Sequence, residues 1–131
     1  MVVFSTKSDY AVIILIELAR NQGFTSLGKI AKDKHLPYRY ISRIAGELKN
    51  AGFIESKEGV TGGYTLSRNP KDISALDILR VFEEGVNATK CIVHGTSCPR
   101  ESICSAKSKW NSMNQEMLAV VGEYTLADFI A

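Results

Sequence analysis

Three cysteines lie close together in the second half of the chain and are the residues best suited to chemistry. The pattern is C-x6-C-x5-C, formed by Cys91, Cys98 and Cys104 within the segment CIVHGTSCPRESIC. Thiolates are soft ligands that bind iron–sulfur clusters, zinc or copper(I). The spacing lacks the paired C-x2-C motifs typical of structural zinc sites. Zinc held by three cysteines and His94 stays an alternative, as do three unliganded thiols.

The composition is that of an ordinary globular chain and excludes several classes of protein. Of the 131 residues, 45% are hydrophobic and 23% are charged, which allows one domain plus an assembly element. We see no signal peptide, and the apolar run at residues 11–19 contains Glu17 and is too short to span a membrane. We therefore expect a cytoplasmic protein without membrane association. In such a reducing compartment the three cysteines are not expected to form a disulfide framework, and an odd number would leave one unpaired. No nucleophile–base constellation or carboxylate pair suggests an enzyme.

A basic segment in the first half of the chain is typical of a phosphate-binding face. The segment from Ser26 to Asn50 holds six basic residues (Lys29, Lys32, Lys34, Arg39, Arg43 and Lys49) and two acidic ones (Asp33 and Glu47). We expect two short helices here, at residues 26–34 and 37–50, joined by a tight turn, with Pro37 as the first residue of the second. The second helix has one basic face and one apolar face, and the apolar face is formed by Ile41, Ile44, Ala45 and Leu48. This is the helix-turn-helix pattern, although a merely solvated basic face is the alternative.

Elements on either side of this pair predict a winged helix-turn-helix. A helix is expected before it, at residues 9–21, with an inward face formed by Val12, Leu15, Ile16 and Ala19. After it, two short strands at residues 53–57 and 64–66 flank a turn with three glycines, which predicts a β-hairpin. A hairpin directly after a recognition helix forms a wing. The expected fold is therefore mainly α with a small β-wing, and the winged helix-turn-helix covers residues 6–68.

The rest of the chain predicts three more helices. Ser74 and Asp77 form a capping box that begins a helix ending at Gly85, and Thr125 begins a last turn of helix in the same way. A long helix is expected from near Ser102, with Cys104 in or near its first turn, where the helix dipole favours a thiolate. Its apolar residues recur at alternating intervals of three and four, namely Ile103, Ala106, Trp110, Met113, Met117, Val120 and Tyr124. Such a seam predicts a homodimer.

These elements divide the chain into three parts. Residues 1–85 form the expected DNA-binding domain, residues 86–104 the cysteine-bearing loop, and residues 105–131 the dimerisation helix with its C-terminal turn. The whole chain resembles the family of winged-helix regulators that includes IscR, NsrR, RirA and CymR (the Rrf-two family). The resemblance lies in the segments STKSDYA, LPYRYISRIAGELKNAGFI, GVTGGYTLSR and TLADF, together with the three cysteines and Trp110.

The resemblance implies that the cysteines hold an iron–sulfur cluster, 2Fe–2S or 4Fe–4S, with one further ligand. In IscR-type proteins a histidine follows the third cysteine by three residues, and Lys107 occupies that position here. In NsrR-type proteins an aspartate of the partner subunit's first helix is the ligand, and Asp9 matches it. Asp9 is therefore the expected fourth ligand and His94 the second choice, while the alternative role of Asp9 is to complement the helix dipole. The gap between Cys91 and Cys98 is one residue longer than in IscR and NsrR, so the type of cluster stays open.

The helix geometry and the resemblance agree on the residues that face DNA. The start of the recognition helix should enter the major groove, which exposes Tyr38, Arg39, Tyr40, Ser42 and Arg43, and Arg43 is the best candidate for a base edge. Phosphate contacts are expected from Lys29, Lys32 and Lys49. Some relatives place a wing arginine in the minor groove, where this chain has Glu58. Lys57 or Arg68 can substitute for it.

Together these features predict a homodimeric transcription regulator that binds a pseudo-palindromic double-stranded DNA operator. We expect a repressor whose cluster senses redox state, nitric oxide or iron supply. One alternative is a regulator of the same fold without a cluster, which responds through cysteine oxidation or a partner protein. A zinc-binding structural module is the other.

Overall fold

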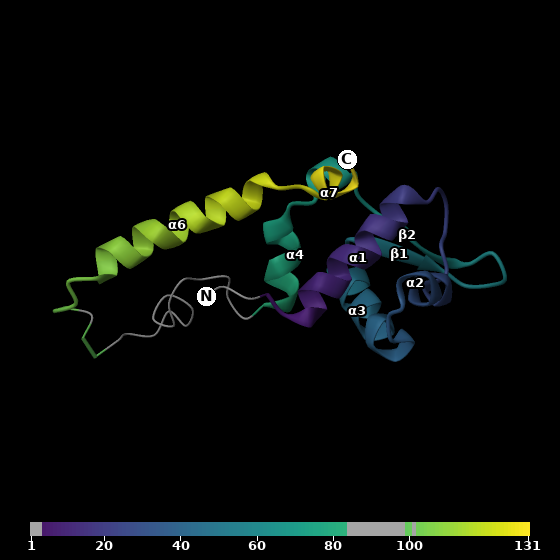
Figure 1. Ribbon diagram of the computed structural model, residues 1–131, viewed down its shortest axis with the longest axis horizontal. Coiled ribbons are helices and arrows are strands. Elements are labelled where there is room, and N and C mark those ends of the chain that lie inside the picture. Colours follow the sequence, from purple (N-terminus) through teal and green to yellow (C-terminus); the bar gives the residue numbers. More distant parts are fainter. Residues whose placement is uncertain (1–3, 84–98, 101) are drawn as a thin grey trace.

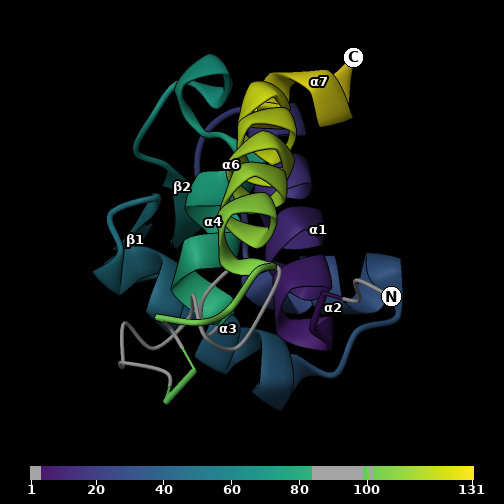
Figure 2. The same cartoon turned by 90° about the vertical axis from the view of Figure 1, so that its left-hand side faces the viewer.

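The computed structural model describes residues 4–83, 99–100 and 102–131. Helices α1 to α4, the two strands and α7 pack into one body, and α6 extends away from it (Figure 1). Helix α6 lies against α4, as the view along α6 shows (Figure 2). This arrangement is mainly helical with one two-stranded antiparallel sheet, in agreement with the expected fold class. None of the described helices has a stretch long and apolar enough to cross a membrane.

Helix α1 (Thr6–Arg20) passes through the centre of the body. It begins three residues earlier than expected, because the Ser5 hydroxyl caps it by accepting a hydrogen bond from the Ser8 N–H at 3.3 Å. Its buried face also differs from the expected one, since Val12, Ile16 and Ala19 are only partly buried. The buried residues are Ser8, Ala11, Ile14, Leu15 and Leu18. Because almost every residue from 11 to 18 is apolar, periodicity alone fits more than one face.

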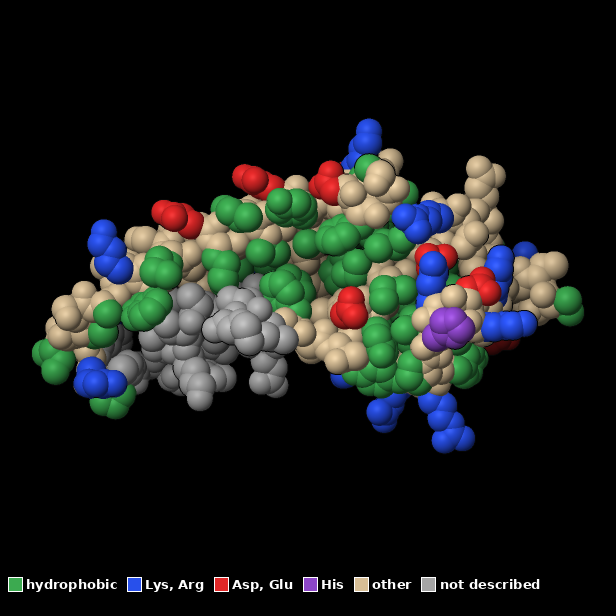
Figure 3. Space-filling model, in the orientation of Figure 1, with side chains coloured by type: hydrophobic (Ala, Val, Ile, Leu, Met, Phe, Trp, Pro, Cys, Tyr) green, Lys and Arg blue, Asp and Glu red, His purple; other side chains and the backbone are tan. Residues whose placement is uncertain are grey.

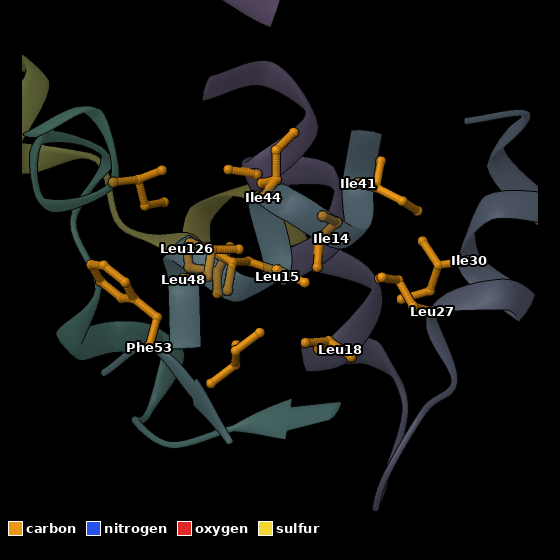
Figure 4. Close-up of a cluster of buried hydrophobic side chains, with 14 of the residues drawn as sticks. Ile14, Leu15, Leu18, Leu27, Ile30, Ile41, Ile44, Leu48, Phe53 and Leu126 are labelled. Carbon is orange, nitrogen blue, oxygen red and sulfur yellow. The ribbon is translucent and has the colours of Figure 1, made fainter. Parts of the chain in front are cut away.

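Helices α2 (Leu27–Lys34) and α3 (Tyr38–Asn50) form the helix-turn-helix. The Ser26 hydroxyl caps α2 by accepting from the Lys29 N–H at 3.2 Å. His35 makes the tight turn in the left-handed region at φ 54°. Pro37 has extended backbone and is the N-cap residue, so α3 begins at Tyr38, one residue later than expected. The side chains of both helices meet α1 in the core, where Ile14 and Ile41 lie between Ile44 and the α2 residues Leu27 and Ile30 (Figure 4).

The wing consists of β1 (Ile54–Lys57) and β2 (Gly63–Leu66), paired antiparallel with Ile54 opposite Leu66. It is joined to the chain ahead of α2, because Thr25 and Tyr64 exchange backbone hydrogen bonds of 2.9 and 2.8 Å. Gly63 has φ 142°, and a Cβ there would lie 2.3 Å from the Thr25 carbonyl oxygen. Only glycine permits this close approach.

The elements after the wing, α4 and α7, both pack into the body, and α6 between them extends away from it (Figure 1). A 3-10 turn (Pro70–Asp72) leads to α4 (Ala75–Phe82), which begins with the expected capping box of Ser74 and Asp77 and ends before Gly85. Helix α7 (Leu126–Ile130) begins with the second capping box, formed by Thr125 and Asp128. Leu126 is fully buried in the core, and its N–H donates to the Ile73 carbonyl at 2.8 Å. The C-terminal turn therefore completes the core of the body.

Helix α6 (Lys107–Glu123) begins later than the sequence predicts. Ile103, Cys104 and Ala106 all precede its first residue, so Cys104 lies three residues before the helix and not within its first turn as expected. The described N-cap residue, Ala106, has no side chain that could cap the helix. The remaining seam residues do lie on α6 or at its C-cap, and several are exposed: Trp110, Met113, Val120 and Tyr124.

Candidate nucleic-acid interface and cysteine site

The outward face of α3 is the main candidate for DNA contact. Its four buried residues, Ile41, Ile44, Ala45 and Leu48, fix the helix on the core. Arg39 and Arg43 are one turn apart on the opposite side, and both are exposed. Several Lys and Arg side chains project from this end of the molecule, where α2, α3 and the wing lie (Figure 3). Because the guanidinium groups stay in contact with water, this face presents positive charge without a desolvation cost.

One flank of α3 is held against α1. The ring of Tyr40 packs edge-to-face on the ring of Tyr10, with 5.5 Å between centroids and 79° between planes. Seven residues further along α3, about two turns on, Glu47 Oε1 lies 3.6 Å from Lys7 Nζ. Tyr40 is half-buried, so its ring positions α3, and only its outer edge is left for DNA.

The other DNA candidates differ in exposure. Tyr38 is 56% exposed at the start of α3, whereas Ser42 is half-buried. The three lysines expected on phosphates are all exposed, namely Lys29, Lys32 and Lys49. Long, mobile ammonium groups on the rim suit phosphate contacts, which orient a protein without reading sequence.

Both basic candidates of the wing are placed over aromatic rings. Lys57 Nζ lies 5.7 Å from the centre of the Phe24 ring. The Arg68 guanidinium lies 4.7 Å from the centre of the Phe53 ring and donates to the Ala51 carbonyl at the end of α3. Arg68 therefore has partners within the chain, and Lys57 is the freer of the two wing cations.

Asp9 lies in the first turn of α1, exposed, at the edge of a pocket of about 370 Å³. The other residues that line this pocket are Phe4, Ser8, Val12, Ala75, Leu79 and Phe129. A carboxylate at this position complements the positive end of the helix dipole and is also accessible to a ligand from outside the protomer. Both roles proposed for Asp9 remain compatible with its placement.

A half-buried carboxylate at the start of α1 was not found by sequence reasoning. Glu83 follows α4, and its Oε1 accepts hydrogen bonds of 2.7 Å from both the Ser5 N–H and the Ser8 hydroxyl. Burial of the Glu83 carboxyl by itself raises its pKa, but the hydrogen bonds from the Ser5 backbone and from the Ser8 and Ser5 hydroxyls outweigh this and lower it below its usual range. The partners are more than seventy residues apart in sequence, and no local pattern signals such a pair.

The cysteine site is described only in part. Cys104 is an exposed free thiol and lines a shallow surface depression near the start of α6 with Lys107 and Ser108. Cys91, Cys98 and His94 lie outside the described residues. Within the described part of the chain, no group of three or more His, Cys, Asp or Glu side chains could hold a metal ion. The two described candidate ligands, Cys104 and Asp9, are both accessible.

A helix-turn-helix with a basic outward face, followed by a β-wing, defines a winged-helix DNA-binding protein. The chain matches the family model Rrf2, described as iron-dependent transcriptional regulator, over residues 4–131. It belongs to the Rrf2 family of transcription regulators, which are not enzymes.

Known relatives agree with this assignment. The HTH-type transcriptional regulator CymR of Bacillus subtilis is 33% identical over 126 residues, which are 95% of this chain and 86% of CymR. The structure of that CymR, the global cysteine regulator, superposes with a TM-score of 0.81 at 30% identity and covers 99% of this chain and 97% of CymR. IscR of T. potens superposes with a TM-score of 0.77 at 30% identity, covering 98% of this chain and 86% of IscR. The winged-helix fold expected from the sequence is thereby confirmed.

Proposed function

We propose that this regulator is a homodimeric repressor that places α3 in the major groove of each half of a pseudo-palindromic operator. The observation that carries the proposal is the exposed pair Arg39 and Arg43 on the side of α3 opposite its buried face. Arg43 is the residue proposed to read a guanine, since a guanidinium can donate two hydrogen bonds to one base edge. Arg39, Tyr38 and Ser42 would support this contact from the first turns of α3.

Phosphate contacts would come from the lysines around α3 and from the wing. Lys29 and Lys32 lie on α2, Lys49 lies in the last turn of α3, and Lys57 ends β1. Each phosphate that a lysine neutralises releases a counterion from DNA, so binding should weaken steeply with salt. We assign Arg68 a smaller role at DNA, because its guanidinium is already held by Phe53 and Ala51.

The second copy is proposed to cover the apolar face of α6. Trp110, Met113, Val120 and Tyr124 are each at least 40% exposed in one protomer. Four large apolar side chains along one helix form a surface that a monomer rarely leaves in water. Pairing of α6 with its copy would bury this surface and set the spacing of the two recognition helices.

The sensor is proposed to be an iron–sulfur cluster held by Cys91, Cys98 and Cys104, with Asp9 of the partner subunit as fourth ligand and His94 as second choice. The described donors fit this assignment, because Cys104 is a free surface thiol and Asp9 an exposed carboxylate. When bound, such a cluster supplies a centre whose redox state or integrity changes with the signal. An oxygen ligand is displaced more easily than a thiolate. Asp9 lies in the same helical turn as Ser8, whose hydroxyl donates a hydrogen bond to Glu83. A change at Asp9 would therefore act directly on the start of α1.

A cluster-free regulator is the second candidate. It is favoured by the similarity to CymR, whose structure is described as that of a global cysteine regulator. In this case the exposed thiol of Cys104 would be the group that is oxidised or covered by a partner protein. A zinc-binding structural module is the third candidate.

Purification without oxygen separates these candidates. The proposed protein is brown and contains iron and acid-labile sulfide in roughly equal amounts per protomer, and Cys104→Ser lowers both. Zinc alone supports the structural module, and a metal-free protein that binds DNA only when reduced supports the cluster-free regulator. Either result contradicts the cluster.

Salt titrations of DNA affinity test the interface. Lys29→Gln and Lys32→Gln should each reduce the slope of log affinity against log salt by about 1, whereas Arg43→Gln should cost about 1–3 kcal/mol and relax specificity at one base pair. Lys109→Gln, an exposed residue of α6, is the matched control and should leave the slope unchanged. A wild-type affinity that does not depend on salt would contradict DNA binding through these lysines.

A further inference from the structure

Gly46 stands in the middle of α3, where a glycine is unfavourable. A glycine inside a helix destabilises it relative to alanine, because the unfolded chain gains conformational freedom. The usual reasons for accepting this cost are a positive φ, tight packing inside the protein, or close approach of the backbone to a ligand.

The first two reasons do not hold for Gly46. It is not among the described glycines with positive φ, which are Gly23, Gly52, Gly59 and Gly63. A Cβ built at Gly46 would meet no atom of the described residues within 4 Å. Gly63 shows the contrast, since a Cβ there would collide with the Thr25 backbone. Within the described part of the chain, alanine would fit at position 46 without strain.

The position of Gly46 on α3 points to the third reason. It follows Arg43 by three residues and Arg39 by seven, so all three lie along one side of the helix. This side is opposite the buried face of Ile41, Ile44, Ala45 and Leu48, and it is separate from the flank that Tyr40 and Glu47 hold on α1. The gap in side chains therefore continues the line of the two exposed arginines.

We infer that Gly46 is the point of closest approach between the backbone of α3 and the DNA duplex, and that the missing side chain lets Arg39 and Arg43 reach the base edges. The inference rests on the proposed function, because it takes DNA to be what the arginine face binds. Bidentate hydrogen bonds between arginine and guanine tolerate little displacement of the helix. A side chain at position 46 would hold the helix away from the groove and lengthen those bonds. Gly46 is thus a positioning residue for recognition.

The experiment uses the full-length protein and the duplex that the wild type selects from a random-sequence DNA library. Gly46→Ala and Gly46→Leu have similar helix propensities but different sizes, so both raise the midpoint of thermal unfolding by a few degrees. Affinity for the selected duplex falls about tenfold with alanine and about a hundredfold or more with leucine, as expected when one and then two arginine contacts are lost. Higher stability with lower affinity is a combination that a structural role of Gly46 would not produce.

Three results overturn the inference. Unchanged affinity in Gly46→Leu shows that nothing approaches the backbone there. Equal losses in the two variants show that helix flexibility matters rather than space. A lowered unfolding midpoint shows that the glycine serves the fold. A wild-type protein that selects no duplex at all is a different failure, since it contradicts DNA binding before either variant is measured.

Discussion

The Ser8 hydroxyl donates a 2.7 Å hydrogen bond to Oε1 of Glu83 and so joins the first turn of α1 to the residue that follows α4. The same carboxylate oxygen accepts from the Ser5 N–H, which is at the N-cap of α1. Glu83 therefore supplements the cap of α1 from a distant part of the chain. The turn that it holds also carries Asp9 and Lys7, and Lys7 pairs with Glu47 of α3.

Replacing Glu83 should make the free energy of unfolding less dependent on pH between pH 3 and 7. The lowered pKa of Glu83 means that its ionised form is favoured by folding, so its contribution is present above the ordinary pKa of 4.5 and is lost as the pH falls through the lowered value. Glu83→Gln should cost about 1–2 kcal/mol at pH 7, and the difference from the wild type should shrink towards pH 3. Thermal unfolding between pH 3 and 7 measures this, with the exposed Glu116→Gln as control. A difference that is constant over this range would show that ionisation of Glu83 is not involved.

Tyr40 should matter to the fold more than to DNA contact. Because its ring packs edge-to-face on Tyr10, Tyr40→Ala should destabilise the protein by about 2 kcal/mol, while Tyr40→Phe keeps the ring pair and should cost less than about 0.5 kcal/mol. Denaturant unfolding gives the stabilities, and DNA titration of Tyr40→Phe tests the hydroxyl. A loss of affinity in Tyr40→Phe without loss of stability would assign the hydroxyl to the DNA interface instead.

The dimer should depend on the apolar face of α6. Trp110→Glu and Met113→Glu place charges where the second copy is proposed to lie, and each should weaken the dimer by about 2–4 kcal/mol. Sedimentation at several concentrations should show monomers for these variants. Gln115→Glu adds the same charge at another exposed position of α6 and should leave the dimer intact. Dimeric Trp110→Glu would place the interface elsewhere.

Asp9 should control the lifetime of the cluster. Asp9→Ala removes the proposed oxygen ligand and should speed the loss of visible absorbance in the presence of an iron chelator by about tenfold. Asp72→Ala, an exposed carboxylate far along the chain, should behave like the wild type. If Asp9→Ala is as durable as the wild type and His94→Ala is not, the histidine is the ligand.

Local signals predicted the helix-turn-helix and its wing correctly. Ser26, Ser74 and Thr125 begin helices where their side chains and spacing indicated, because caps and capping boxes depend only on neighbours in sequence. The hairpin followed from its glycines for the same reason. These features needed no knowledge of how distant segments pack.

The errors arose where the answer depends on distant contacts. The buried side of α1 was assigned wrongly because its centre is apolar on most sides, and only packing against α3 and α7 selects Ala11, Ile14 and Leu18. The start of α6 at Lys107 was placed too early because Ile103 and Ala106 continue the seam spacing without being helical. Glu83 was not predicted to be structural, because its partners Ser5 and Ser8 are distant in sequence. The cluster ligands and the DNA contacts stay predictions.

The burial of Leu126 has a consequence for the order in which the protein becomes active during synthesis. The core beneath the helix-turn-helix contains a side chain that emerges from the ribosome after α6 has been made. A nascent chain that has α1 to α4 but not α7 lacks this part of the core and the hydrogen bonds from Ala75 to Tyr124 and from Leu126 to Ile73. The body that carries the helix-turn-helix thus completes its folding only after α6, the proposed dimerisation helix, has been synthesised. Few chains would therefore bind an operator as incomplete monomers.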